Sequence, residues 1–489
     1  MVRRLLFVPV ICLAQSNSVD PFVRVRASTI ALEHVRVIDG TGAPAKADQT
    51  IVISGGRIAA IGNSGSVPIP TSAERMDLRG RTAIPGLVGM HDHLFFAGDL
   101  FHAQERLAHD MPFSYPRLYL ANGVSTIRTT GSFEPYTDLE VKKAIDRGLR
   151  VGPKMNVTGP YLEGEGYPII QVHKLTGLDD VQRTVDYWAS EGVGSFKVYA
   201  DITRSQLKAA VAAAHRHGLT ITGHLCSIGF REAAEMGIDG LEHGLFVDTE
   251  FDPHKKPDEC PDESNAAAVD LDVNGAEIQG LIRVLVKHHV AVTSTLPVWE
   301  EYLVPRSEST REFTRTRPEI SKRVLVALSE AAQKECEAGR RLALEAGRNG
   351  PASREGAPFQ RDALMFAKEM EFERAFVRAG GLLLAGPDDV LCGDIAGYGD
   401  QREIELLVEA GFSTVEAIQI ATLNGARFLE QADRIGSLTA GKQADIAIVS
   451  GDPTDNIQDI ENVELVFKDG VGYDSKKLIE SVRGQVGIR

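Results

Sequence analysis

The chain has 489 residues, of which 43% are hydrophobic and 25% charged, and its formal net charge is −15. This length suits one large domain with a smaller one, and the composition is typical of a globular protein. The acidic balance, without any concentrated Lys/Arg tract, disfavours nucleic acids and anionic membrane surfaces as partners.

The N-terminal segment, residues 1–28, differs from the rest. Arg3 and Arg4 precede a short apolar run that ends at Ala14. Positive charge, a short apolar run and a small residue are the pattern of a signal peptide, with cleavage after Ala14. The run is too short to span a bilayer, and nothing later in the chain resembles a membrane helix. We expect a periplasmic or secreted protein, and a cytoplasmic one is the alternative.

The five cysteines are scattered and contain no CxxC pair: Cys12, Cys226, Cys260, Cys336 and Cys392. This spacing argues against a disulfide framework and against a cysteine-based zinc finger.

Both ends of the chain are rich in short strands. Residues 29–83 and 435–489 contain apolar runs of strand length that Gly, Asp and Pro residues interrupt. The simplest packing lets these two segments complete one sheet structure, a small β-sandwich beside a central domain at residues 84–434.

The central domain alternates strands with helices. One helix is expected to begin after Thr203 as its N-cap and to end near Gly218. Eight strands are expected, at residues 84–90, 123–128, 154–158, 195–199, 219–226, 238–245, 290–295 and 381–385. This alternation predicts an α/β fold with a parallel sheet, most simply a (β/α)8 TIM barrel with insertions at 251–275 and 297–359. The alternative is a doubly wound open sheet, which the lack of a GxGxxG or Walker loop disfavours.

Two histidines end the first of these strands. Because alternate residues of a strand share a face, His91 and His93 point the same way, and such a pair is the start of a metal site. Four more ionisable residues lie in or after later strands: Lys197, His224, His243 and Asp388. The active sites of such barrels lie at the carboxyl ends of the strands, so all six groups are expected at one mouth.

Each of these residues also has an ordinary explanation. A single strand histidine is often a hydrogen-bonded core residue, and Asp388 is also suited to capping a helix. A buried Lys197 is harder to explain, because an unpaired ammonium in an apolar wall is costly. Carbamylation by CO2 would convert it to an anion able to bridge two metals.

With these residues the chain resembles the amidohydrolase superfamily, of the binuclear type with a carbamylated lysine. Lys197-Val198-Tyr199, Gly223-His224 and the segment 239–244 most resemble the imidazolonepropionase-related group, which includes dipeptidases of the Xaa-Pro type. The resemblance implies two divalent ions, Zn2+ by preference. His91, His93 and Asp388 would hold one, His224 and His243 the other, and carbamylated Lys197 with a hydroxide would lie between them.

By the same resemblance, Asp388 would take a proton from the hydroxide and deliver it to the leaving nitrogen. The chain also departs from its relatives. Pro387 replaces a common threonine, and the segment 159–162 replaces a Gly-Gly-His-Gly segment that supplies a substrate-contacting histidine. Tyr161 and Tyr199, just beyond strand ends, are the candidates for touching the substrate.

The resemblance therefore implies hydrolysis of a carbon–nitrogen bond in a small molecule, and the expected substrate is a dipeptide or an N-acyl amino acid. A cyclic amide or imidazolone hydrolase is a second interpretation. A non-catalytic scaffold of the same fold is a third. A homo-oligomer is compatible with all three.

Overall fold

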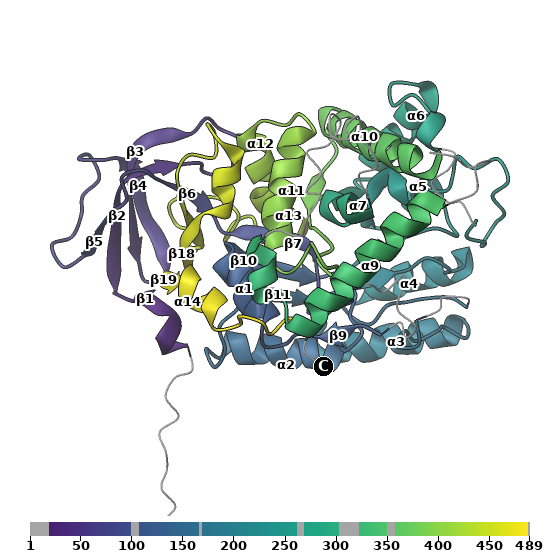
Figure 1. Cartoon of the computed structure of the whole chain (residues 1–489), viewed down its shortest axis with the longest axis horizontal. Helices are drawn as coiled ribbons and strands as arrows, with labels where there is room; N and C mark the ends of the chain where they lie inside the picture. Colours follow the sequence, from purple (N-terminus) through teal and green to yellow (C-terminus); the bar gives the residue numbers. More distant parts are fainter. Residues whose placement is uncertain are drawn as a thin grey trace, which may run out of the picture.

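The structure is a computed structural model that describes residues 19–98, 107–165, 169–261, 268–302, 322–349 and 357–487. The chain has an α/β fold, with a sheet at one end of the molecule and a larger body of alternating strands and helices beside it (Figure 1). The signal-like segment ending at Ala14 and residues 303–321 of the second insertion lie outside the described residues. Within the described part of the chain, no helix combines the length and apolar character needed to cross a bilayer.

The end sheet joins strands from both ends of the chain, which lie side by side in purple and yellow in Figure 1. Its strands are β1 (Val23–Val25), β2 (Thr29–Val37), β3 (Lys46–Ser54), β4 (Arg57–Asn63), β5 (Glu74–Asp77), β6 (Arg81–Pro85), β17 (Ile446–Ser450), β18 (Val463–Lys468) and β19 (Val471–Asp474). They follow the order β1-β19-β18-β17-β6-β2-β3-β4, with β5 paired to β2. The antiparallel pair β6–β17 connects the two halves, and apolar side chains of both halves, such as Ile51 and Ile448, share one buried core. The predicted union of the chain ends in one sheet structure is confirmed.

Eight further strands run parallel in two groups. Strands β7 (Leu87–Asp92), β10 (Val124–Thr129) and β11 (Lys154–Val157) form the first group. The second group contains β12 (Ser195–Val198), β13 (Thr220–Gly223), β14 (Gly240–Glu242), β15 (Ala291–Ser294) and β16 (Leu383–Ala385). Parallel bridges from Thr158 to Ser195 and from Leu162 to Val198 connect the groups. The alternating pattern therefore correctly predicted parallel strands.

The first predicted barrel strand, residues 84–90, is wrong as a single element. The structure divides it at Gly86: β6 enters the end sheet and β7 enters the parallel group. A Cβ on Gly86 would lie 2.3 Å from Ser125 Oγ, so only glycine lets the chain pass here. The apolar run continues across this crossing, which hides the division in the sequence.

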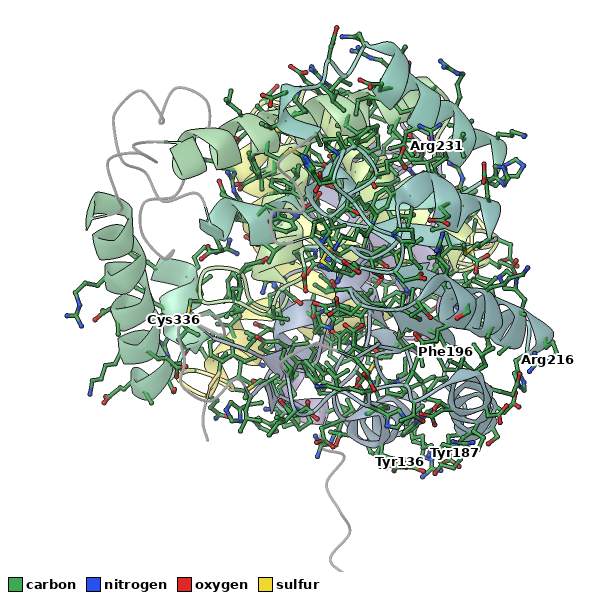
Figure 2. The ribbon with its side chains drawn as sticks, turned by 90° about the vertical axis from the view of Figure 1, so that its right-hand side faces the viewer. Tyr136, Tyr187, Phe196, Arg216, Arg231 and Cys336 are labelled. Carbon is green, nitrogen blue, oxygen red and sulfur yellow. A yellow bond between two sulfur atoms is a disulfide. The ribbon has the colours of Figure 1, made fainter. Side chains whose placement is uncertain are left out.

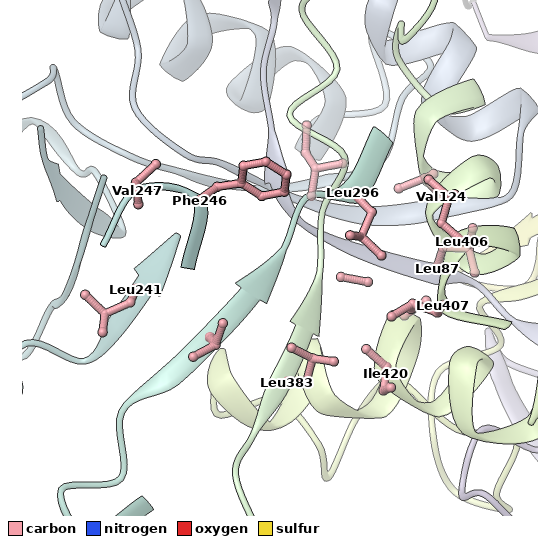
Figure 3. Close-up of a cluster of buried hydrophobic side chains, with 14 of the residues drawn as sticks. Leu87, Val124, Leu241, Phe246, Val247, Leu296, Leu383, Leu406, Leu407 and Ile420 are labelled. Atoms are coloured by element: carbon pink, nitrogen blue, oxygen red, sulfur yellow. The ribbon is translucent and has the colours of Figure 1, made fainter. Parts of the chain in front are cut away.

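Helices pack around the parallel strands, and the last of them packs against the end sheet. They are α1 (Tyr115–Ala121), α2 (Pro135–Asp146), α3 (Leu178–Glu191), α4 (Arg204–Arg216), α5 (Phe230–Glu235), α6 (Ala276–Lys287), α7 (Leu296–Tyr302), α8 (Lys322–Ala327), α9 (Glu330–Asn349), α10 (Ala357–Arg378), α11 (Tyr398–Glu409), α12 (Thr414–Gln419), α13 (Gly425–Phe428) and α14 (Ser475–Glu480). Thr203 caps α4 through a reciprocal capping box with Gln206, as the sequence predicted. Figure 3 shows strand residues such as Leu241 and Leu383 packing in one core with Leu406 and Leu407 of α11. This core fixes where the strands end, and the candidate site lies at those ends.

The expectation of no disulfides is wrong. Cys226 is bonded to Cys260, and Cys336 of α9, labelled in Figure 2, is bonded to Cys392. The partners are 34 and 56 residues apart in the chain, so the spacing rules for compact disulfide motifs could not identify them. One bond ties the first insertion to the segment after β13, and the other ties α9 to the loop that follows Asp388.

Candidate metal centre

The six residues singled out in the sequence all meet at the carboxyl ends of the parallel strands. His91 and His93 are at the end of β7, Lys197 lies within β12, and the others directly follow strands: His224 follows β13, His243 follows β14 and Asp388 follows β16. Strands that run parallel end at the same edge, so residues as distant in the chain as His91 and Asp388 become neighbours.

The polar atoms of this cluster are in contact. Lys197 Nζ lies 2.9 Å from His91 Nε2, and His93 Nε2 lies 3.0 Å from Asp388 Oδ1. His91 Nε2 is 3.6 Å from the same carboxylate oxygen, and His243 Nε2 is 4.0 Å from Asp388 Oδ2. The carboxylate of Asp388 is thus surrounded by three imidazole nitrogens.

The two remaining imidazoles complete the cluster. The ring of His243 lies 4.7 Å from that of His91 and 4.6 Å from that of His224, measured between centroids. The Nδ1 atom of His224 is buried and has no hydrogen-bond partner among the described residues. Burial lowers the pKa of His224 to about 3 and that of His93 to about 4. These imidazoles are therefore neutral at pH 7, the form that binds a metal.

Hydrogen bonds at Nδ1 orient three of these rings. His91 Nδ1 lies 3.0 Å from Glu242 Oε2, His93 Nδ1 lies 3.1 Å from the Gly131 carbonyl oxygen, and His243 Nδ1 lies 2.8 Å from Thr295 Oγ1. For His91 and His93 the partner is an acceptor, so Nδ1 donates and Nε2 keeps its lone pair. That lone pair faces the centre of the cluster, which is how metal-binding histidines are arranged.

Glu242 and Arg128 also belong to the site, although neither was among the predicted site residues. Both are fully buried, and Arg128 donates to Glu242 Oε1 over 3.2 Å. Burial opposes the charge of Glu242, yet His91 and Arg128 hold the pKa of its carboxyl well below the usual range. The sequence did contain a sign of this pair: Arg128 in β10 and Glu242 in β14 are oppositely charged residues inside strands that are otherwise mostly uncharged.

Asp388 is held by its backbone as well as by its side chain. Its φ of 59° lies in the left-handed region, as does the φ of 68° at His243. The Asp388 N–H donates to the His91 carbonyl oxygen over 2.9 Å. Such conformations cost energy and concentrate at functional sites. Burial disfavours its charge, but His91 and His93 hold the pKa of Asp388 well below its ordinary value.

Lys197 is also unusual because it is buried. Its side chain is 1% exposed, and burial lowers its pKa to about 8. A lysine with this pKa is partly neutral near pH 8, and a neutral amine is the form that reacts with CO2.

Aromatic rings form the wall beside the cluster. The ring of Tyr199 lies 4.6 Å from that of His224, and the ring of Tyr161 lies 5.0 Å from Tyr199. Both predicted tyrosines therefore stand next to the six residues. Trp299, which the sequence did not single out, has its ring 5.8 Å from that of His243.

The donor set fits a metal ion. Donor atoms of His91, His93 and Asp388 all lie within 4.8 Å of one another. Imidazole nitrogen and carboxylate oxygen are ligands that Zn2+ and related ions accept. The buried, neutral His224 and His243 supply two further nitrogen donors at the same place.

Comparisons with known proteins identify similar sequences and a similar fold. The model of the amidohydrolase family matches residues 369–472, a segment that contains Asp388. An imidazolonepropionase from Caulobacter vibrioides (strain NA1000 / CB15N) is 43% identical over 86 residues, which are 17% of this chain and 21% of that protein. An imidazolonepropionase from Stenotrophomonas maltophilia (strain R551-3) is 25% identical over 254 residues, 43% of this chain and 62% of that protein. The matches thus span less than two thirds of these relatives.

A solved structure extends the likeness to nearly the whole chain. The crystal structure of a Xaa-Pro dipeptidase with bound methionine in the active site has a TM-score of 0.65. It covers 91% of this chain and 100% of its own, at 20% identity, which shows a shared fold. The family match and the imidazolonepropionase relatives support membership of the amidohydrolase superfamily, and the solved structure shows the same fold.

Proposed function

We propose that this protein is a metal-dependent hydrolase that cleaves an amide or peptide bond of a small substrate, as a dipeptidase or an N-acyl amino acid amidohydrolase. The convergence of four neutral imidazoles, one buried lysine and one carboxylate at the strand ends carries the proposal. The superfamily and the Xaa-Pro dipeptidase with the same fold support this substrate class.

Each residue of the cluster has a place in this proposal. His91, His93 and Asp388 would hold one divalent ion, and His224 and His243 a second, with Zn2+ as the best match to the donors. Lys197 would bridge them as its CO2 carbamate. Bound ions of this kind supply Lewis acidity and lower the pKa of a water ligand to roughly 7.

The side chains of the site would transfer the proton, orient the metal-binding rings and contact the substrate. Asp388 accepts the proton of the attacking water on a carboxylate oxygen and passes it to the leaving nitrogen, so that no covalent intermediate is needed. Glu242 and the Gly131 carbonyl hold the His91 and His93 rings at fixed angles. Tyr161 and Tyr199 would contact the substrate, whose apolar part the ring faces can pack against.

A second candidate is hydrolysis of a cyclic amide such as an imidazolone. The local identity of 43% to an imidazolonepropionase favours it. One ion per chain and an unmodified Lys197 would also favour it. The third interpretation, a non-catalytic scaffold, has less support because the full set of donors lies together.

Metal counting combined with a substrate screen tests the proposal. We expect two ions per chain by elemental analysis, a mass increase on Lys197 of about 44 Da for CO2, and turnover of dipeptides or N-acyl amino acids. His91→Ala is expected to lose at least one ion and all turnover, because it removes a donor of the centre. Unchanged metal content in His91→Ala, or a wild-type protein without hydrolytic activity on any amide tested, would contradict the proposal.

We further propose that the eight parallel strands close into a (β/α)8 barrel beside a small β-sandwich formed by residues 29–83 and 435–489. The two bridges between the strand groups and the hydrogen bond from the Asp388 N–H to His91 support closure on both sides. An experimental structure with β16 remote from β7 would contradict it.

We also propose that the protein works in the periplasm or outside the cell. The two disulfides support an oxidising compartment, since cytosolic proteins rarely keep such bonds. In a secreting host, we expect the mature protein to lack Met1–Ala14. We also expect Cys226, Cys260, Cys336 and Cys392 to resist alkylation until a reductant is added. An intact Met1–Ala14 segment, or four free thiols, would contradict this location.

A further inference from the structure

A second group of acidic residues lies directly behind the candidate metal centre. It consists of Asp92 at the end of β7, Asp389 after β16 and Asp400 in the first turn of α11. One carboxylate oxygen of each lies within 4.8 Å of the others. All three side chains are buried, with exposures of 0%, 0% and 5%. None of them belongs to the donor set of the proposed centre.

The carboxylate of Asp92 has no protein partner. Neither of its oxygens accepts a hydrogen bond from any described residue, and Asp389 Oδ2 is likewise unpartnered. Among the described residues, no lysine or arginine forms an ion pair with any of the three aspartates. A buried carboxylate without a counter-charge is costly, so this arrangement calls for a cation or for bound protons.

Asp92 packs closely against the backbone, and a small cavity lies beside the cluster. Asp92 lies against Gly89, where a Cβ would approach Asp92 Oδ2 to 2.0 Å. Gly89 and Asp400 together line a cavity of about 10 Å3, the size of one water molecule. Asp400 therefore borders a space that could hold one water ligand of a bound ion.

Hydrogen bonds hold the carboxylates of Asp389 and Asp400 in place, as is common for oxygen ligands of a metal ion. Asp389 Oδ1 accepts from the Tyr119 hydroxyl over 2.8 Å and from the His93 N–H over 3.3 Å. Asp400 Oδ2 accepts from the Gly397 N–H over 3.2 Å. Asp389 keeps its other oxygen, Oδ2, for a further contact.

We propose that Asp92, Asp389 and Asp400 form a binding site for a hard divalent cation, with Ca2+ as its ligand, separate from the zinc-type centre. A set of carboxylate oxygens without nitrogen or sulfur donors selects hard cations. Calcium–oxygen distances of about 2.3–2.6 Å allow two ligand oxygens to lie up to about 5.2 Å apart across the ion. The three carboxylate oxygens lie within 4.8 Å of one another, a spacing that one Ca2+ ion can bridge.

A Ca2+ ion at this site would also stabilise the neighbouring zinc-type centre. Asp92 lies between His91 and His93 in the chain, and Asp389 follows Asp388. A Ca2+ ion shared by these aspartates would tie β7 to the loop after β16, the two segments that carry three donors of the proposed centre. The expected consequence is a calcium-stabilised fold, whether or not the protein hydrolyses amides.

Titration of the zinc-loaded protein tests the site without using activity. After passage over a chelating resin, we expect elemental analysis to find one Ca2+ per chain on return of 1 mM calcium, in addition to the zinc. We also expect a rise in melting temperature of about 3 °C or more, because the ion binds only the folded state. Asp400→Asn should weaken Ca2+ binding at least about tenfold.

Glu373→Gln is the matched control. Glu373 is also buried, at 1% exposure, and both of its oxygens are unpartnered, but it lies outside the cluster. Its amide variant should bind Ca2+ like the wild type. Equal loss of binding in both variants would overturn the proposal.

Terbium luminescence provides a second measurement in case Asp400→Asn does not fold. Tb3+ replaces Ca2+ at oxygen sites, and the nearby Tyr119 should sensitise its emission, so that Tyr119→Phe dims the signal while calcium still competes for the site. No calcium uptake by the wild type at 1 mM, with no tyrosine-sensitised Tb3+ emission, would show that protons neutralise the cluster and would overturn the site.

Discussion

Asp388→Asn is expected to lower kcat/KM by about 10³-fold, within the range of about 10²–10⁴-fold for loss of a general acid–base group. The carboxylate lies within 3.6 Å of the Nε2 atoms of His91 and His93, and it is the proposed carrier of the proton. Asparagine keeps the size of the side chain and tolerates the left-handed backbone that Asp388 adopts. The loss should therefore come from the missing charge and not from misfolding.

Asp258→Asn is the matched control for this variant. Asp258 has a φ of 61°, almost the same backbone conformation, but it lies in the first insertion and pairs with Arg204. Its amide variant should keep wild-type kcat/KM and metal content. Steady-state kinetics on the substrate found in the screen, with circular dichroism as the check on folding, decide the result. Activity of Asp388→Asn within tenfold of wild type would remove Asp388 from the proposed chemistry.

Glu242→Gln is expected to lower the free energy of unfolding by about 3–5 kcal/mol. Stability is expected to fall because Glu242 forms a buried ion pair with Arg128, and the variant leaves a fully buried guanidinium without its counter-ion. Because the pKa of Glu242 is held well below its usual range, the pair is charged at neutral pH. The same change weakens the acceptor for His91 Nδ1, so metal affinity should fall by about 10–100-fold.

Glu464→Gln is the control for the stability effect. Glu464 pairs with Arg81 over 2.7 Å, but both side chains are about one-third exposed, at 34% and 35%. Water screens this pair, and its loss should cost no more than about 1 kcal/mol. Denaturant unfolding of both variants and competition with a metal chelator give the two quantities. Equal stabilities for Glu242→Gln and Glu464→Gln would show that the buried pair has no special role.

Local patterns were sufficient wherever one segment determines its own structure. The Thr203 cap of α4 needs only the residues of one turn, and it formed as predicted. The alternation of strands and helices likewise predicted parallel strands, whose ends then bring His91, His93, Lys197, His224, His243 and Asp388 together. The residue types of the candidate centre were therefore available from the sequence, although their roles remain proposals.

Contacts between distant segments could not be predicted from local sequence patterns. The crossing at Gly86 depends on the Ser125 side chain, 39 positions later, and apolar residues continue on both sides of it. The Cys336–Cys392 bond depends on where α9 packs. The Glu242–Arg128 pair joins two different strands over a separation of 114 residues.

The sequence alone determined the alternation of strands and helices and the chemical groups near their ends, because helix caps and strand periodicity are set by neighbouring residues. Only the tertiary structure decided which of those groups meet. Side-chain contact depends on how strands stack and helices pack, and that packing is summed over the whole core. The aspartates behind the candidate centre show this most clearly. Asp92 is far in the chain from Asp389 and Asp400, and the three form one cluster only because β7 and α11 both pack against β16.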